Sequence, residues 1–245
     1  MIRRNLMGAV KRAISSIFSW DFSRIGYTSE NTTLLQQFED AIAYSEEKAR
    51  TFTPSNASTH FKGDKKLVFA PMVDTSNATD VSYMFYNCSS LAVVPQLDLK
   101  KAATINYMFN GCSVLAYLME INASEANYMT SAFYGCSNLK KIKMLDVKNI
   151  LTMGYAFHGC SSLEYLSIIN LGMSRLDTYD FSGASVWGMD GDENRQSLID
   201  SLITYSYDRA SNGMDTATIK LSANTKALLT DEEIAQIEAK GFTIA

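Results

Sequence analysis

The chain has 245 residues, 47% of them hydrophobic and 20% charged, and its formal net charge at pH 7 is -4. This apolar content is enough for the core of one or two domains, whereas the negative charge gives no electrostatic reason to expect a nucleic-acid partner. No stretch approaches the roughly 20 uninterrupted apolar residues of a membrane-spanning helix.

Residues 1–28 are predicted to be a basic N-terminal segment with an amphipathic helix over residues 1–20. Its apolar side chains recur at helical spacing and its basic ones lie elsewhere around the helix. The apolar set is Ile2, Leu6, Val10, Ile14, Ile17 and Phe18, and the basic set is Arg3, Arg4, Lys11 and Arg12. Lys11 and Arg12 interrupt the apolar run and no small-residue cleavage site follows, so a standard signal peptide is not expected. We expect this helix to dock on its own protein or on an assembly partner, or alternatively on a membrane surface.

Residues 29–60 are predicted to be a capping helix and a linker. An apolar stripe over Ser29 to Thr51, opposite an acidic side, is typical of an amphipathic helix. The stripe consists of Leu34, Leu35, Phe38, Ala41, Ile42 and Ala49. Pro54 and the polar stretch 55–59 then end the helix. This position suits a helix that covers the open first end of a repeat array.

Residues 61–189 repeat a seven-residue phrase, Phe-x-Gly-Cys-Ser-x-Leu, every 24 residues. The copies begin at Phe61, Phe85, Phe109, Phe133, Phe157 and Phe181. The central four keep the cysteine, and the outer two have Asp64 and Ala184 in its place. A fixed period of about 20 to 50 residues is typical of a solenoid, in which each unit buries its apolar face against its neighbours. The predicted fold is therefore an α/β repeat solenoid of about six 24-residue coils.

Comparing one position across the copies separates inward-facing from outward-facing residues. Positions three and six residues after the Leu, and four before the Phe, are apolar in nearly every copy and are predicted to face the core. They are Ala70, Val94, Leu118, Ile142 and Leu166; Val73, Leu97, Ile121, Leu145 and Ile169; and Val81, Ile105, Met129 and Met153. We interpret Leu-x-x-(Ile/Leu/Val) as a short strand in each coil, about 4.8 Å from the next in a parallel ladder. The stretch before each Phe would turn the chain back as a short helical or irregular segment.

The residues of the phrase suit a tight coil. Phe is the largest core residue, and the Gly position, occupied by Asn87 in one copy, is predicted to need a positive φ. The four cysteines follow the repeat count, which argues against a disulfide framework. They are predicted to be buried and reduced, although in-register neighbours fall within disulfide range.

Positions with mixed chemistry at a fixed register are predicted to face solvent and to contact a partner. These residues are Phe69, Val93, Tyr117, Lys141, Tyr165, Met119 and Lys143, with Met72, Met144 and Ile168 nearby. Exposed Tyr and Met side chains are enriched at interaction sites. The alternative is that a cap or the N-terminal helix already covers this face.

Residues 190–245 lose the repeat register and are predicted to form an α/β cap over the second end. A helical pattern runs from Glu193 to Ala210, and an alternating strand pattern covers residues 216–221. Thr230 and Glu233 fit a capping box that opens a helix, for which Gly241 is the stop signal. Residues 242–245 are predicted to be a last short strand.

The repeated phrase closely resembles the leucine-rich repeats of the Bacteroides-surface-protein (BspA-like) type, whose units read roughly Leu-x-x-Ile, then Met/Ala-Phe-x-Gly-Cys-Ser-x-Leu. The resemblance covers about residues 61–189. It implies surface proteins of gut and oral bacteria, some of them adhesive, or related proteins of phage that infect such hosts. It supplies no catalytic residues. Exported members carry a signal peptide, and this chain shows no standard one.

Enzymatic and metal-dependent functions are not expected. His60 lies in the linker and His158 at a variable, exposed repeat position, and no phosphate-binding glycine loop or nucleophile elbow occurs. The cysteines lie in one line, not in a tetrahedral zinc set. In the stretch after Asp190, Arg195 stands where a calcium loop needs Gly. We expect no cofactor and no metal.

The sequence therefore predicts a non-enzymatic recognition or adhesion module on a bacterial surface or phage particle, binding a protein or host-surface ligand. The alternative is a structural virion or assembly component anchored by its N-terminal helix. Cell surface or virion is the expected location, and the cytoplasm stays open. The identity of the ligand cannot be read from the sequence.

Overall fold

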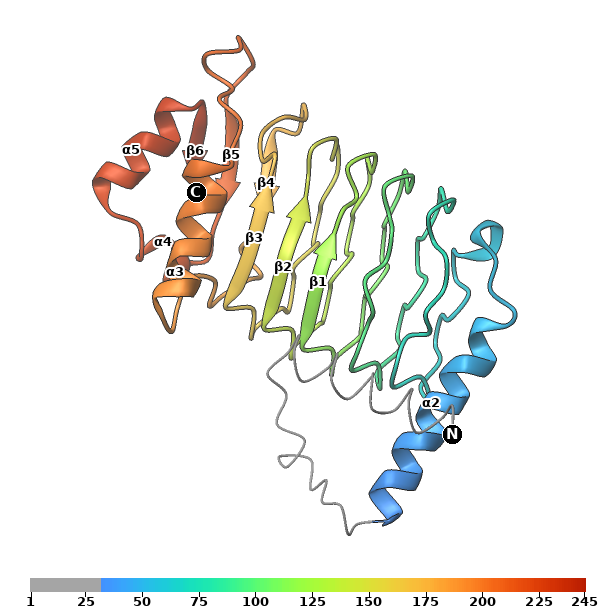
Figure 1. The fold of residues 1–245 in the computed structure, drawn as a ribbon. Coiled ribbons are helices and arrows are strands. Elements are labelled where there is room, and N and C mark those ends of the chain that lie inside the picture. The colour runs from blue at the N-terminus through green and yellow to red at the C-terminus, as the bar shows by residue number, and fades with distance from the viewer. Residues whose placement is uncertain (1–31) are drawn as a thin grey trace. The chain divides into compact units, whose positions relative to one another are not determined.

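A computed structural model describes residues 32–245, so the helix predicted over residues 1–20 lies outside the described residues. The elements in chain order are α2 (Thr32–Ala49), a 3-10 turn (Pro54–Asn56), β1 (Tyr117–Ile121), β2 (Lys141–Asp146), β3 (Tyr165–Ile169), β4 (Thr178–Asp180), α3 (Asp192–Ile199), a π-helical turn (Asp200–Thr204), β5 (Ala217–Lys220), α4 (Ala223–Lys226), α5 (Asp231–Ala239) and β6 (Phe242–Ile244) (Figure 1). The chain divides into two units between Tyr44 and Ser45, inside α2, and each is described by itself. No helix in the described part combines the length and apolar character needed to cross a membrane.

Helix α2 confirms the helix predicted over Ser29 to Thr51, of which residues 29–31 lie outside the described residues, and it ends at Ala49. Near its end, Lys48 lies 3.3 Å from a carboxylate oxygen of Asp64 in the first repeat copy. The 3-10 turn that follows begins at Pro54. Proline is favoured at such a first position because its φ is fixed and it has no N–H to leave unpaired. Covering of the first repeat by this helix stays a prediction.

Strands β1, β2 and β3 form a parallel sheet in that order (Figure 1). Residues one repeat apart are partners, so Tyr117 pairs with Lys141 and Lys141 with Tyr165. The predicted ladder is thus present in the third to fifth copies, whereas at the strand position the first two copies share a single bridge, between Phe69 and Val93. The first two copies carry prolines where β1 has Met119. Proline supplies no N–H for a ladder bond, which explains why regular strands begin only at β1.

Consecutive turns carry the phrase and join each copy to the next by backbone hydrogen bonds. Within a copy, the N–H of Cys88 donates to the carbonyl of Phe85 at 3.1 Å, closing a turn. Between copies, the N–H of Phe85 donates to Met108 at 2.9 Å, and Phe109 and Phe133 donate in the same way to the copies that follow them. The predicted irregular return segment is therefore an ordered stack of turns.

Positive φ angles recur at two positions of the first five turns. The predicted Gly position is confirmed in five copies, with φ between 56° at Asn87 and 78° at Gly159. The sixth copy differs, because Gly183 is needed for a close approach: a Cβ there would lie 2.1 Å from the carbonyl oxygen of Phe157. The second position, two residues before the Phe, was not predicted. It has φ 68°, 59°, 57°, 52° and 57° at Thr59, Tyr83, Tyr107, Ser131 and Tyr155.

The core is built from the repeated positions. The six Phe side chains are at most 1% exposed, and successive ring centroids from Phe61 to Phe181 are 5.2, 5.5, 5.8, 5.4 and 5.5 Å apart. The predicted inward positions three after the Leu and four before the Phe are buried throughout. The position six after the Leu is buried in the middle copies only, since Val73 and Ile169 at its ends are half-buried.

The cysteines are free and buried, as predicted. Each thiol donates to the carbonyl oxygen of the Phe in the preceding copy, at 2.9 Å for Cys88 and 3.1 Å for Cys112, Cys136 and Cys160. A small side chain with a weak donor therefore fits the space at this position, and its thiol adds a second hydrogen bond to a carbonyl that already accepts a backbone N–H within its own turn.

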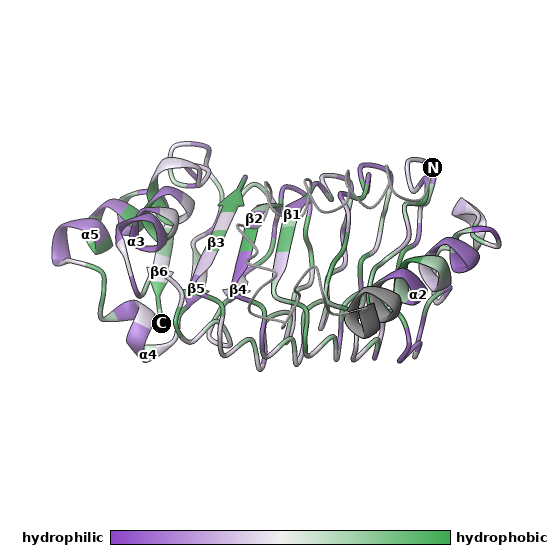
Figure 2. Ribbon diagram, turned by 60° about the horizontal axis from the view of Figure 1, so that its bottom comes forward, coloured by the Kyte–Doolittle hydropathy of each residue, from purple (hydrophilic) through white to green (hydrophobic). Residues whose placement is uncertain are grey.

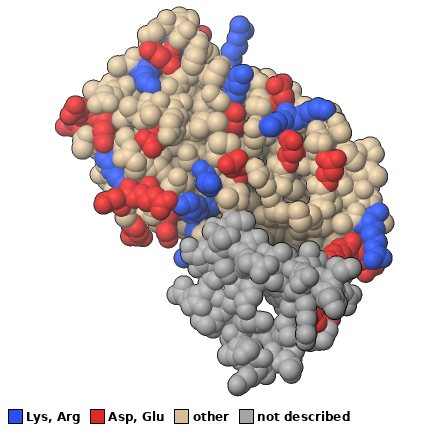
Figure 3. Space-filling model, in the orientation of Figure 1, with Lys and Arg blue, Asp and Glu red and all other residues tan. Residues whose placement is uncertain are grey.

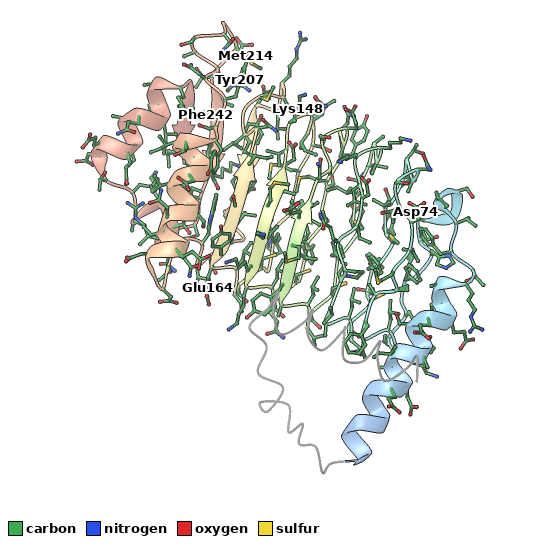
Figure 4. The ribbon with its side chains drawn as sticks, in the orientation of Figure 1. Asp74, Lys148, Glu164, Tyr207, Met214 and Phe242 are labelled. Carbon is green, nitrogen blue, oxygen red and sulfur yellow. The ribbon has the colours of Figure 1, made fainter. Side chains whose placement is uncertain are left out.

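The C-terminal part adds a second parallel sheet, in the order β4-β5-β6. Strand β4 lies directly before Phe181, at which the sixth copy begins, and its partner β5 comes from beyond the repeats. Phe242 of β6, labelled in Figure 4, packs edge-on against the buried Tyr179 of β4, with ring centroids 6.4 Å apart. The outer helices α3 and α5 are largely hydrophilic, with narrow hydrophobic bands (Figure 2). The repeat stack is thus continued by the tail, while the domain boundary at residue 190 stays a prediction.

The tail elements follow the sequence prediction with one correction. The capping box of Thr230 and Glu233 opens α5, and Gly241 ends it with φ 86°. Strands β5 and β6 lie within the predicted ranges. The helix predicted to reach Ala210 instead passes into the π-helical turn and ends at Thr204. The reason lies in Arg209, which is buried and donates to the carbonyls of Gly172 and Ser174 at 2.9 and 2.7 Å, contacts that draw the chain away from the helix axis.

Candidate functional site

The residues predicted to contact a partner lie on the strand side of the repeats. The structure brings them into two groups, Phe69 with Val93, and Tyr117 with Lys141 and Tyr165. All five are half-buried rather than fully exposed. Their backbones pair directly, so their side chains occupy the same position on successive copies.

The neighbouring predicted residues differ in accessibility. Met72 is 87% exposed, Lys143 is exposed and Met119 and Met144 are half-buried. Ile168, predicted to lie on this face, is fully buried. The cause is a shift of register between β2 and β3, by which Leu145 pairs with Ile168 and not with the residue after it. A shift of one residue turns a side chain to the opposite face, so Ile168 enters the core in place of Ile169.

Lys141 and Tyr165 are engaged within the protein. The Nζ of Lys141 lies 2.6 Å from a carboxylate oxygen of Glu193 in α3 and 3.9 Å from the ring centroid of Tyr165. Partial burial raises the pKa of Tyr165, against the opposing effect of Lys141. These two predicted contact residues therefore help to hold the C-terminal helix in place. That a cap covers this face, the alternative stated above, stays a prediction.

The outer edge of β3 is occupied by the same tail. The backbone N–H of Ile168 donates to the hydroxyl of Ser201 at 2.9 Å, and this hydroxyl donates to Leu166 at 3.1 Å. Gly188 donates its N–H to Glu164, labelled in Figure 4 near the start of β3, at 2.9 Å. Covering an edge strand in this way blocks pairing with another chain. Away from this tail, the predicted site comprises the half-buried Phe69, Val93, Tyr117 and Met119 and the exposed Met72 and Lys143.

A second group of side chains was missed by sequence reasoning and lies on the turns that carry the phrase. These residues come from positions two before and one after the core Phe, and we call them the tyrosine face: Tyr83, Tyr86, Tyr107, Tyr134, Tyr155 and His158. Tyr134 and Tyr155 are 40% and 67% exposed, His158 is exposed, and the others are half-buried. The signal was present in the sequence as recurrent Tyr on both sides of the Phe. The two positions are three residues apart and flank the Phe (83 and 86, 155 and 158), so only the folded turn shows that their side chains share one face.

The rings of the tyrosine face form two clusters. In the first, Tyr83 stacks on Tyr107 with centroids 4.7 Å apart and an interplanar angle of 8°, and the Nζ of Lys62 lies 4.9 Å from the ring centroid of Tyr83. In the second, Tyr134 stacks on His158 at 4.9 Å and 22°. Partial burial and the neighbouring phenols Tyr107 and Tyr86 raise the pKa of Tyr83, so its hydroxyl remains a donor at neutral pH.

The described residues offer little for catalysis. Burial raises the pKa of Cys88 and of Cys160 to about 12 and those of the other two thiols well above the ordinary value, so none supplies a thiolate nucleophile. No group of three His, Cys, Asp or Glu side chains within residues 32–245 is arranged to hold a metal ion. On the face shown in Figure 3, the charged side chains lie mostly in separate groups of both signs. The absence of enzymatic activity stays a prediction.

Comparison with known proteins gives a family. The family model described as "Mycoplasma protein of unknown function, DUF285" matches residues 4–119 and again residues 55–170. The second match is displaced by about two repeats, as expected for an internally repeated sequence. Together the matches extend over more than half of the chain. No curated protein and no solved structure matches it.

Proposed function

The chain belongs to the DUF285 family, and we propose that its repeats form a leucine-rich-repeat-like solenoid of the Bacteroides-surface-protein type that acts as a non-enzymatic recognition module. The bonding of each copy to the next supports the solenoid, as do the parallel strands one repeat apart and the line of Phe rings. A stack of this kind displays side chains at regular intervals on a rigid scaffold.

The observation that supports a recognition function is a contrast on the strand side: core positions are apolar in every copy that keeps the Leu, whereas surface positions differ in chemistry from copy to copy. The positions three and six residues after the Leu hold only apolar residues, while the exposed or half-buried positions between them include Met72, Val93, Met119 and Lys143. An exposed Met is adaptable and suits a partner surface better than a solvated one. The partner is a protein or a host-surface ligand, and the module is displayed on a bacterial cell or a phage particle.

A photo-crosslinking amino acid at position 143 tests the strand side. In the producing cells, illumination is expected to yield a defined adduct from this position and none from position 226, where the matched control replaces the exposed Lys226 of α4. Equal adducts at both positions, or none at 143, would contradict the proposed surface.

Fractionation tests display. The full-length protein is expected to be degraded by protease added to intact cells, or to sediment with particles from the culture medium. Protease-resistant protein recovered only from the cytosol would exclude display. Sedimentation with virions combined with failure of the crosslinking test would favour the structural alternative.

A further inference from the structure

The tyrosine face is a second candidate binding surface, separate from the strand side. Its residues lie on a preorganised support, because the turns beneath them are bonded from copy to copy and the Phe rings inside are at most 1% exposed. Side chains held on such a support lose little freedom on binding.

Local structure does not explain the tyrosines. Tyr83, Tyr107 and Tyr155 have φ between 57° and 59°, a conformation in which Gly or Asn is less strained than a bulky residue. Burial does not explain them either, since Tyr155 is 67% exposed. Three tyrosines in strained, partly exposed positions indicate a requirement for the ring itself, and such outliers favour functional sites.

Within the turns that carry these rings the surface has no charged residue, and among the described residues the one cation over the rings is that of Lys62, 4.9 Å from the ring centroid of Tyr83 and 5.2 Å from that of Tyr86. Residues 82–90, 106–114, 130–138 and 154–162 contain no Asp, Glu, Lys or Arg, although 20% of the whole chain is charged. Their exposed and half-buried polar residues are mainly Ser, Asn, Thr and Tyr. A charged partner gains little from such a surface, since a single cation at one end, already placed over two rings, gives little steering or counterion release. The composition favours a neutral ligand rich in hydrogen-bonding groups.

The arrangement also favours a ligand that is itself repeated. The two ring clusters lie on successive copies, and between them the amide of Asn110 donates to the carbonyl of Ser131 at 3.5 Å. A protein partner would call for an apolar centre of anchors and pockets, whereas Val114 is the one large aliphatic side chain in these four stretches that is exposed. Pyranose rings stack their C–H faces on aromatic rings, and their hydroxyls bond to Ser, Asn and Tyr.

We propose that the tyrosine face binds a linear, uncharged polysaccharide. One sugar ring stacks on the cluster of Tyr83, Tyr86 and Tyr107, and another on the cluster of Tyr134, Tyr155 and His158. Asn110 and the neighbouring hydroxyl groups bond to the sugar hydroxyls between the two clusters. Both ring clusters contribute, so affinity increases with chain length until a ligand spans them.

Affinity electrophoresis of the full-length protein tests this, with amylose, hydroxyethyl cellulose and linear mannan as neutral probes and heparin as the charged one. At least one neutral polysaccharide is expected to retard the protein in a concentration-dependent way, and heparin is not. The double variant Tyr134→Asn/Tyr155→Ser uses residues that other copies carry at these positions, namely Asn110 and Ser131, so its fold should persist. Its affinity should be roughly tenfold weaker, as the loss of two aromatic contacts implies.

The matched control is Tyr205→Asn, which removes a tyrosine that is 46% exposed in the C-terminal part, outside the tyrosine face. It should bind like the wild type. The inference is overturned if no neutral polysaccharide retards the wild type, if heparin alone does, or if the double variant, with an unchanged melting temperature, binds as well as the wild type. An equal loss in the control also overturns it.

Discussion

Replacing Phe133 by Ala should strongly destabilise the repeats. Its ring is 1% exposed and lies between those of Phe109 and Phe157, with centroids 5.8 and 5.4 Å away. Removing a buried Phe costs about 3–5 kcal/mol, which combines lost burial, lost aromatic pairs and the cavity that remains. At about 2–4 °C per kcal/mol for a domain of this size, the melting temperature should fall by about 6–20 °C.

Urea unfolding followed by circular dichroism measures this free energy, with the exposed Tyr134→Ala as control. Phe133→Leu keeps part of the volume and should lose less than Phe133→Ala. Because neighbouring copies are coupled in a stack, the midpoint should shift for the cooperative unit as a whole. A loss below about 1 kcal/mol for Phe133→Ala, which is typical of surface positions, or a loss equal to that of Tyr134→Ala, would refute the line of Phe rings as the centre of the core.

Three further predictions concern the thiols, one glycine and one ion pair. Burial raises the pKa of Cys88 and of Cys160 to about 12 from an ordinary 9.0. Their contribution to stability is therefore complete below pH 9 and is lost as the pH rises to about 12. Urea midpoints that do not fall across this range would contradict this prediction, as would rapid alkylation of the native thiols. Gly183→Ala should lower the free energy of unfolding by about 1–3 kcal/mol, because the added Cβ would lie 2.1 Å from a backbone carbonyl oxygen. An unchanged melting temperature would show that the turn can relax. A double-mutant cycle on Lys141 and Glu193 should give a coupling of only about 0.2–1 kcal/mol, since Glu193 is largely exposed, and a value well above this would indicate a more rigid contact with α3.

Much of the fold can be predicted from the sequence because each repeat position occurs in several copies that can be compared. An apolar residue at one position in every copy indicates the core, and Gly or Asn at one position indicates a positive φ, as Asn87 and Gly111 show. The same comparison placed the cysteines inside. Local chemistry was sufficient for the start and end of α5, since a capping box and a terminal Gly act within a few residues of each other.

The candidate sites depended on contacts that no single repeat position encodes. The slip that buries Ile168 arises where β3 meets β2, and the pairing of Lys141 with Glu193 joins residues far apart in sequence. Likewise, only the stacking of turns sets Tyr83 against Tyr107. The sequence by itself determined the period, the core positions and the backbone demands of the turns, because these are local and repeated. The tertiary structure decided which variable side chains stay accessible, because that depends on where the tail docks and on how neighbouring copies align.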